Sequence, residues 1–304
     1  PGGNTVSAAE HTMAMLLAMT RAIPAADRSM RAGRWERGRF VGAELDGKIL
    51  GVLGMGRVGR EVAHRARSFG MQVIGYDPFV SAEEMGRSQP VFVPLEELFR
   101  RSDFITVHTP LTPQTRHLVG EKELAACKPG VRIVNCARGG IVDENALAAA
   151  LKSGHVAGAA FDVYEQEPPG EILFREMDNV VLTPHLAAST AEAQEKVAVV
   201  IAEQVCHYLR DGVARNAVNV TSMDPRVRER VAPHLLLAEK LGRFQGQLTE
   251  GPLREIAVEY SGEIPADAQP ALTVAILKGY FERFLSEPVN AVNALWIARE
   301  RGIR

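Results

Sequence analysis

A glycine-rich turn between an apolar segment and an amphipathic one constrains the fold of this chain most. The turn follows the short apolar run 49–53 and reads Gly54-Met55-Gly56-Arg57-Val58-Gly59. Apolar residues at helical spacing then continue to Gly70, which is typical of a helix that ends on a left-handed glycine. Strand–turn–helix units of this kind build parallel sheets that helices cover on both faces.

The same turn predicts a ligand. Asp77 ends the next predicted strand, 18 positions after Gly59 (77 − 59), which is close to the spacing of about 20 in dinucleotide-binding units. The glycines would let the backbone approach a pyrophosphate, and the N-terminus of the following helix would attract its charge. Asp77 would accept hydrogen bonds from ribose hydroxyls and repel a 2′-phosphate. We therefore predict a Rossmann-type doubly wound α/β fold that binds NAD rather than NADP; a glycine turn without a ligand is the alternative.

Further strands and helices alternate along the chain. Asp143 is a good N-cap for one helix, and Ser7 and Ser189 each begin a Ser-x-x-Glu pattern that is typical of a capping box. The second of these would open a long helix that ends near residue 212. After about residue 219 the pattern changes to helical segments with one short alternating strand, 255–260, which we interpret as a partial small α/β domain. The other strand candidates are 72–77, 104–108, 132–136, 157–162 and 179–182.

Length and composition limit the possible classes of protein. A chain of 304 residues suggests about two domains. The net charge of −2 gives no indication of a nucleic-acid or anionic-membrane partner, and no apolar run approaches the roughly 20 residues of a membrane span. Three cysteines without a C-x-x-C spacing favour reduced thiols in the cytoplasm and give no indication of a metal site.

Three polar residues that follow predicted strands could carry chemistry. His185 is a natural proton carrier near neutral pH, and Glu167 could orient its ring. Arg138 could hold a carboxylate through two parallel hydrogen bonds. Each residue taken alone could instead be structural or solvated. All three, however, follow the carboxyl ends of parallel strands, where open α/β sheets bind ligands, and this shared placement favours a site.

In combination, these motifs resemble the D-2-hydroxyacid dehydrogenase family. The resemblance runs from residue 1 to about 219. Within the family, residues 35–37, 68–71, 75–78 and 104–110 are similar to the branch that oxidises 3-phospho-D-glycerate, and the part after about 221 is similar to that branch's intervening domain. The matching motifs are Ser7-Ala8-Ala9-Glu10, the turn at 54–59 with Asp77, His108-Thr109-Pro110-Leu111, Asn135-Cys136-Ala137-Arg138-Gly139-Gly140 and Pro184-His185.

The resemblance implies roles for these positions. The catalytic residues would be Arg138, Glu167 and His185. The anionic substrate would be held by Arg37, Arg138 and His185, with Arg37 acting either within its own subunit or across a subunit boundary. The residues implied to contact NAD are Gly54, Gly56, Arg57, Val58, Gly59, Asp77, Thr109, Pro110, Cys136, Ala137, Arg138, Asp162, His185, Ala187 and Ala188.

The resemblance also implies an organisation and an activity. Residues 1–185 would be the NAD-binding domain with an N-terminal helix of the dimer type, 186–220 a long helix and return segment to the substrate domain, and 221–304 a partial intervening domain. We expect a piece of a longer chain that lacks most of its substrate domain and the regulatory end. The whole protein would be a cytoplasmic homodimer or homotetramer that oxidises 3-phospho-D-glycerate to 3-phosphohydroxypyruvate. The alternatives are another 2-hydroxy acid, such as glyoxylate, hydroxypyruvate or lactate, and a non-catalytic NAD-sensing protein like the family's corepressors.

Overall fold

The computed structural model describes residues 2–79, 90–211, 216–217, 225–249, 253–266, 268–285 and 288–304. The chain divides into two compact units, Pro1–Val200 and Ile201–Arg304. The expected boundary at residue 221 lies outside the described residues. No helix in the described part of the chain has the length and apolar character that a membrane crossing requires.

The first unit contains a seven-stranded sheet in which every neighbouring pair is parallel. The strand order is β3-β2-β1-β4-β5-β6-β7, which confirms the predicted Rossmann-type doubly wound sheet. Every predicted strand of this unit is present, and among the residues described here the two-residue β3 alone was missed. The strands are β1 (Ile49–Leu53), β2 (Gln72–Tyr76), β3 (Val91–Phe92), β4 (Phe104–Val107), β5 (Val131–Asn135), β6 (Val156–Phe161) and β7 (Val180–Leu182).

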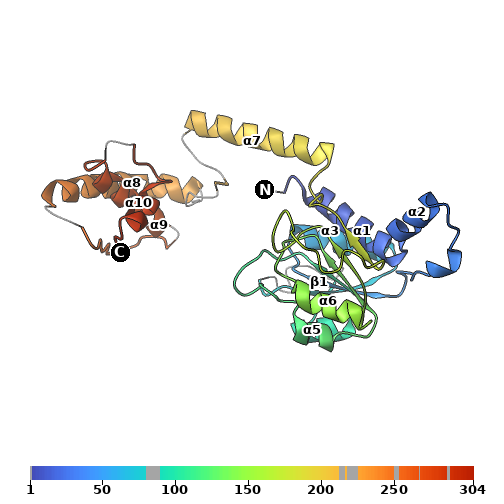
Figure 1. Cartoon of the computed structure of the whole chain (residues 1–304). Coiled ribbons are helices and arrows are strands. Elements are labelled where there is room, and N and C mark those ends of the chain that lie inside the picture. The colour runs from blue at the N-terminus through green and yellow to red at the C-terminus, as the bar shows by residue number, and fades with distance from the viewer. Residues whose placement is uncertain are drawn as a thin grey trace. The chain divides into compact units, whose positions relative to one another are not determined.

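Helices cover both faces of this sheet (Figure 1). One face packs against α1 (Thr5–Thr20) and α3 (Arg57–Ser68), where Leu16, Val52 and Val62 share one buried cluster. The opposite face packs against α4 (Leu95–Arg101), α5 (Glu121–Ala126) and α6 (Glu144–Lys152). The peripheral elements of this unit are α2 (Ile23–Arg31) and the short 3₁₀ helix η1 (Arg37–Arg39), and the helix α7 (Ala191–Asp211) begins in this unit and ends in the second.

The helix caps correct two predictions. Asp143 caps α6 as predicted, because its carboxylate accepts hydrogen bonds from the amides of Asn145 and Ala146. Ser7 does not form a capping box, since α1 already begins at Thr5 and the Ser7 hydroxyl donates to the carbonyl of Ala187 at 2.7 Å. The box predicted at Ser189 is also wrong. The helix α7 begins at Ala191, and the hydroxyl of Thr190 accepts from the amide of Ala193 at 3.2 Å.

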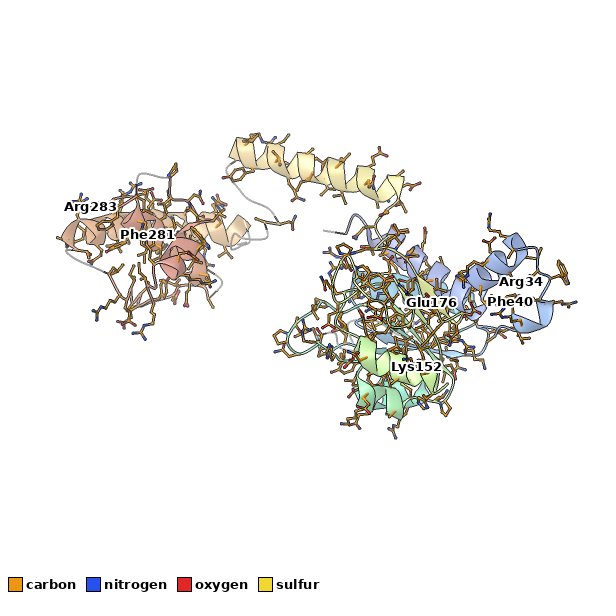
Figure 2. The ribbon with its side chains drawn as sticks, viewed as in Figure 1. Arg34, Phe40, Lys152, Glu176, Phe281 and Arg283 are labelled. Carbon is orange, nitrogen blue, oxygen red and sulfur yellow. The ribbon has the colours of Figure 1, made fainter. Side chains whose placement is uncertain are left out.

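The described part of the second unit contains α8 (Pro225–Leu248), α9 (Gln269–Phe281) and α10 (Ala294–Glu300), and Phe281 is buried in its core (Figure 2). Glycines let α8 and α9 approach closely, because a Cβ on Gly279 would lie 2.0 Å from the carbonyl oxygen of Glu239. The strand predicted at 255–260 does not form. In the described part of the chain this segment has no continuous partner: its backbone hydrogen bonds run only to Arg304, which accepts from the amide of Ile256 and donates to the carbonyl of the adjoining Arg254.

Candidate active site at the switch point of the sheet

The strand order of the sheet reverses between β1 and β4, and ligands bind outside the carboxyl ends of strands at such a point. The turn after β1 touches the segment after β4, because a Cβ on Gly54 would lie 2.8 Å from the carbonyl of His108. A cavity of about 450 Å³ opens here. It is lined by Asn4, Ala8, Val58, His108, Thr109, Pro110, Leu111, Cys136, Ala137, Arg138, His185, Ala187 and Ala188.

Backbone geometry requires glycine at two positions of this turn, and the third glycine leaves room for a ligand. Gly54 has a φ of +94°, a conformation that side chains disfavour. A Cβ on Gly59 would lie 2.0 Å from the carbonyl oxygen of Gly54, so the helix can start this close to the turn only with glycine there. By contrast, Gly56 has no atom within 4 Å of its Cβ position. This open side of the turn, at the N-terminus of α3, fits the pyrophosphate of a dinucleotide.

Two further groups fit a polar ligand at this place. The carboxylate of Asp77 lies at the turn and accepts a hydrogen bond from the amide of Met55 at 2.8 Å. The hydroxyl of Thr109 is buried without a hydrogen-bond partner among the described residues, although it belongs to a residue that lines the cavity. Because an unpaired buried hydroxyl is costly, its position indicates a ligand that completes the site.

His185 and Glu167 form a close pair. The Nδ1 atom of His185 lies 2.6 Å from Oε2 of Glu167, and Oε1 of Glu167 accepts from the amide of Tyr164 at 3.1 Å. Burial would raise the pKa of Glu167, but the hydrogen bonds from His185 and from the Tyr164 amide hold that pKa below its usual value. Glu167 is therefore an anion at neutral pH, and it fixes the orientation of the imidazole ring.

The buried Asn135 at the end of β5 shapes the turn that presents Arg138. Its side chain accepts from the amide of Ala137 at 3.1 Å and donates to the carbonyl of Arg138 at 2.9 Å. The guanidinium of Arg138 stays exposed at the cavity, with one hydrogen bond to the Ala137 carbonyl at 2.6 Å. The next residue is pressed against the segment that leads to Glu167, because a Cβ on Gly139 would lie 1.7 Å from the carbonyl oxygen of Tyr164.

The comparisons with known proteins identify the family. Residues 13–187, more than half of the chain, match the family model described as "D-isomer specific 2-hydroxyacid dehydrogenase, NAD binding domain". The chain belongs to the D-isomer specific 2-hydroxyacid dehydrogenase family. Its matched domain is the NAD-binding domain of that family, which confirms the predicted cofactor. Residues 230–304 match a second family model, described as "D-3-phosphoglycerate dehydrogenase intervening domain".

Relatives and solved structures agree with this assignment to the 2-hydroxyacid dehydrogenases. The D-3-phosphoglycerate dehydrogenases of Synechocystis sp. and Archaeoglobus fulgidus are 47% and 48% identical over the whole of this chain, which spans 55% and 58% of their lengths. A glyoxylate reductase from Paecilomyes thermophila matches with a TM-score of 0.68 and 36% identity, covering 72% of this chain and 66% of that one. The D-lactate dehydrogenase from Aquifex aeolicus, complexed with NAD and lactic acid, matches with a TM-score of 0.64 and 30% identity, covering 69% and 68%.

The remaining residues that the family resemblance singled out lie in three places. The glycines and Arg57 form the turn beside the cavity, and Asp77 follows β2 and bonds to that turn through the Met55 amide. Asp162 is fully buried beneath the loop that carries His185. Arg37 does not line the His185 cavity. It lines another cavity of about 550 Å³ beside Trp35, so its implied contact with substrate across a subunit boundary stays a prediction.

Sequence reasoning missed four residues that line the cavity of this family member: Asn4, Ala8, His108 and Leu111. Asn4 is the N-cap residue of α1 and Ala8 lies four positions later, so helical spacing would have grouped them once one was known to face the site. Burial lowers the pKa of His108 to about 4, and its Nε2 lies 2.9 Å from the Thr106 hydroxyl. His108 is therefore neutral at pH 7.

Proposed function

We propose that the protein containing this chain oxidises 3-phospho-D-glycerate to 3-phosphohydroxypyruvate with NAD, the first step of serine biosynthesis. The observation that carries the proposal is the His185–Glu167 pair, 2.6 Å apart, at a cavity that Arg138 also lines. Support for the phosphorylated substrate comes from the relatives named D-3-phosphoglycerate dehydrogenase and from the intervening-domain match at 230–304.

Arg138 would bind the substrate carboxylate through two parallel hydrogen bonds and so place the C2 carbon near His185. His185 would take the proton of the C2 hydroxyl through Nε2, because Nδ1 faces Glu167. The imidazolium that forms would be stabilised by the Glu167 carboxylate. NAD, when bound, supplies the hydride acceptor for C2.

The cofactor would lie along the residues that adjoin the cavity. The turn at 54–59 would hold the pyrophosphate with Arg57 and Val58, and Asp77 would bind the adenosine ribose. Thr109 and Pro110 would flank the adenosine half. On the nicotinamide side we place Cys136, Ala137, Asp162, Ala187 and Ala188.

The assembly is also part of the proposal. We infer a cytoplasmic homodimer or homotetramer in which the surface around η1 and α2 takes part in a subunit contact. The side chain of Trp35 is 80% exposed there and that of Val41 85%, and exposed apolar groups of this kind support an interface. We further propose that residues 186–220 are the long helix and the return segment to the substrate domain. Light scattering of the purified protein measures its mass in solution. The mass of a monomer would overturn the proposed assembly.

The test of the activity is a substrate panel with the protein encoded by the whole reading frame. NADH formation from 3-phospho-D-glycerate is measured beside that from D-lactate, D-glycerate and glycolate. The proposal predicts the highest kcat/KM for 3-phospho-D-glycerate. A higher value for an unphosphorylated acid would favour the glyoxylate-reductase or D-lactate type, which the matched structures also include. NADH binding without turnover of any acid would favour the corepressor-like alternative.

A further inference from the structure

We infer that His11 of α1 is a positioning residue for the proton carrier, acting on the loop of His185 through the carboxylate of Asp162. The inference rests on the proposed role of His185. His11 itself does not line the cavity at His185.

The buried residue Asp162 binds the backbone of the loop that carries His185. Its side chain is fully buried, with Oδ1 accepting from the amide of Leu186 at 2.7 Å and Oδ2 from the amide of Ala187 at 2.9 Å. Its backbone carbonyl accepts from the amide of His185 at 2.9 Å. Three consecutive amides of the loop therefore bind one residue, and they hold His185 in a left-handed conformation with a φ of +56°.

His11 supplies this carboxylate with a side-chain donor from another element. Its Nε2 lies 3.2 Å from Oδ1 of Asp162, and because a carboxylate only accepts, the tautomer that suits this contact has the proton on Nε2. The same nitrogen lies 3.2 Å from the hydroxyl of Thr183, which donates to Oδ1 at 2.6 Å. One turn earlier on α1, Ser7 donates to the carbonyl of Ala187 at 2.7 Å. Helix α1 is thus connected to the loop of His185 through both the carboxylate and the backbone.

The burial of Asp162 makes these donors important. Burial would raise the pKa of Asp162, but hydrogen bonds from His11, Thr183 and the loop amides hold that pKa below its usual value. Losing one side-chain donor leaves a buried charge less well compensated, and the groups that share that charge then relax. The groups that share it are the amides of Leu186 and Ala187, next to His185.

The experiment compares three variants. His11→Leu removes the donor, His11→Gln keeps an N–H that can reach Oδ1, and His64→Leu at an exposed position of α3 is the matched control. In this chain we measure amide hydrogen exchange at Leu186 and Ala187 and the Kd of NADH. In the protein of the whole reading frame we measure kcat.

For His11→Leu we expect about tenfold faster exchange at both amides. An effect of this size corresponds to the loss of roughly one hydrogen bond to a charged group. We also expect kcat to fall about tenfold through misplacement of the imidazole. The Kd of NADH should rise by clearly less than tenfold, because Asp162 and Ala187 adjoin the proposed place of the nicotinamide only and the glycine turn is unchanged. His11→Gln should recover most of both losses, and His64→Leu should resemble the parent.

Unchanged exchange and kcat in His11→Leu would overturn the inference. A His11→Gln variant as impaired as His11→Leu would also overturn it, because packing would then be the cause. If His11→Leu does not fold, Thr183→Val against Thr183→Ser tests the same oxygen of Asp162 with the same criteria. Normal turnover in a His185→Ala variant would instead refute the proposed function. The link between His11 and the loop would then be tested by the hydrogen-exchange result alone.

Discussion

The Nδ1 atom of His185 lies 2.6 Å from Oε2 of Glu167, and the two residues follow different strands of the sheet. His185 follows β7, and Glu167 follows β6. The pair can form because the parallel strands end at the same edge. Its consequence is chemical: one ring nitrogen faces an anion, and the other remains for a substrate proton.

The first prediction concerns the charge of this carboxylate. Glu167→Gln keeps the size of the side chain but removes the negative charge that stabilises a protonated His185. We expect kcat for the favoured 2-hydroxy acid to fall about 10²-fold, within the range for general acid–base catalysis, while the Kd of NADH stays within about twofold. Steady-state kinetics and NADH fluorescence measure the two quantities. A variant with normal kcat would show that the pair is structural.

The second prediction separates folding from cofactor binding at the glycine turn. Gly59→Ala should destabilise the first unit by about 1–3 kcal/mol, because its Cβ would lie 2.0 Å from the Gly54 carbonyl oxygen. Gly56→Ala should leave the free energy of unfolding within about 0.5 kcal/mol of the parent, since nothing lies within 4 Å of its Cβ position. It should nevertheless raise the Kd of NADH about tenfold or more by blocking the pyrophosphate. Denaturant titration and NADH fluorescence distinguish the variants, and normal NADH binding by Gly56→Ala would contradict the proposed place of the pyrophosphate.

Much of the first unit could be predicted from the sequence because its strands are short apolar runs that end in polar residues or glycines. The strand β3 was missed because two residues carry no periodicity, and the extended segment at 255–260 was taken for a strand because alternation does not show whether a partner exists. Ser7 was misplaced for a related reason. Its hydroxyl bonds to Ala187, a contact across 180 positions that local patterns do not contain.

The third prediction is a pH dependence at His108. The pKa of this residue is about 4 in the folded protein against an ordinary 6.5, so between these values the unfolded chain binds a proton that the folded chain does not. Stability should therefore fall as the pH is lowered from 6.5 to 4, by up to about 3 kcal/mol from this residue. His108→Gln should remove that contribution, so its loss of stability between pH 7.5 and 4.5 should be smaller than the parent's. Urea titrations at the two pH values measure it, and parallel losses in both proteins would refute the prediction.

The fourth prediction concerns the second unit. Gly279→Ala places a Cβ 2.0 Å from the carbonyl oxygen of Glu239 and should force α8 and α9 apart, at a cost of about 1–3 kcal/mol. Gly246→Ala should cost less, since its Cβ would lie 3.0 Å from the Tyr280 carbonyl oxygen. Hydrogen exchange read by peptide shows which unit is affected. Faster exchange within the sheet of the first unit would contradict the assignment of these glycines to a separate core.

The candidate site was predictable in part. The placement of Arg138, Glu167 and His185 after parallel strands indicated that they could meet, and Arg138 and His185 do line one cavity. The support beneath them could not be predicted, because His11 and Asp162 meet only after α1 has packed against the sheet. The neutral His108 was hidden for the same reason, since its pKa depends on burial that a sequence does not state.

The most direct test of the central claim is the turnover of His185→Ala in the protein of the whole reading frame. If His185 carries the substrate proton, kcat for 3-phospho-D-glycerate should fall about 10²–10⁴-fold while the Kd of NADH changes less than about twofold. Turnover within about threefold of the parent, measured with the same NADH affinity, would contradict the account.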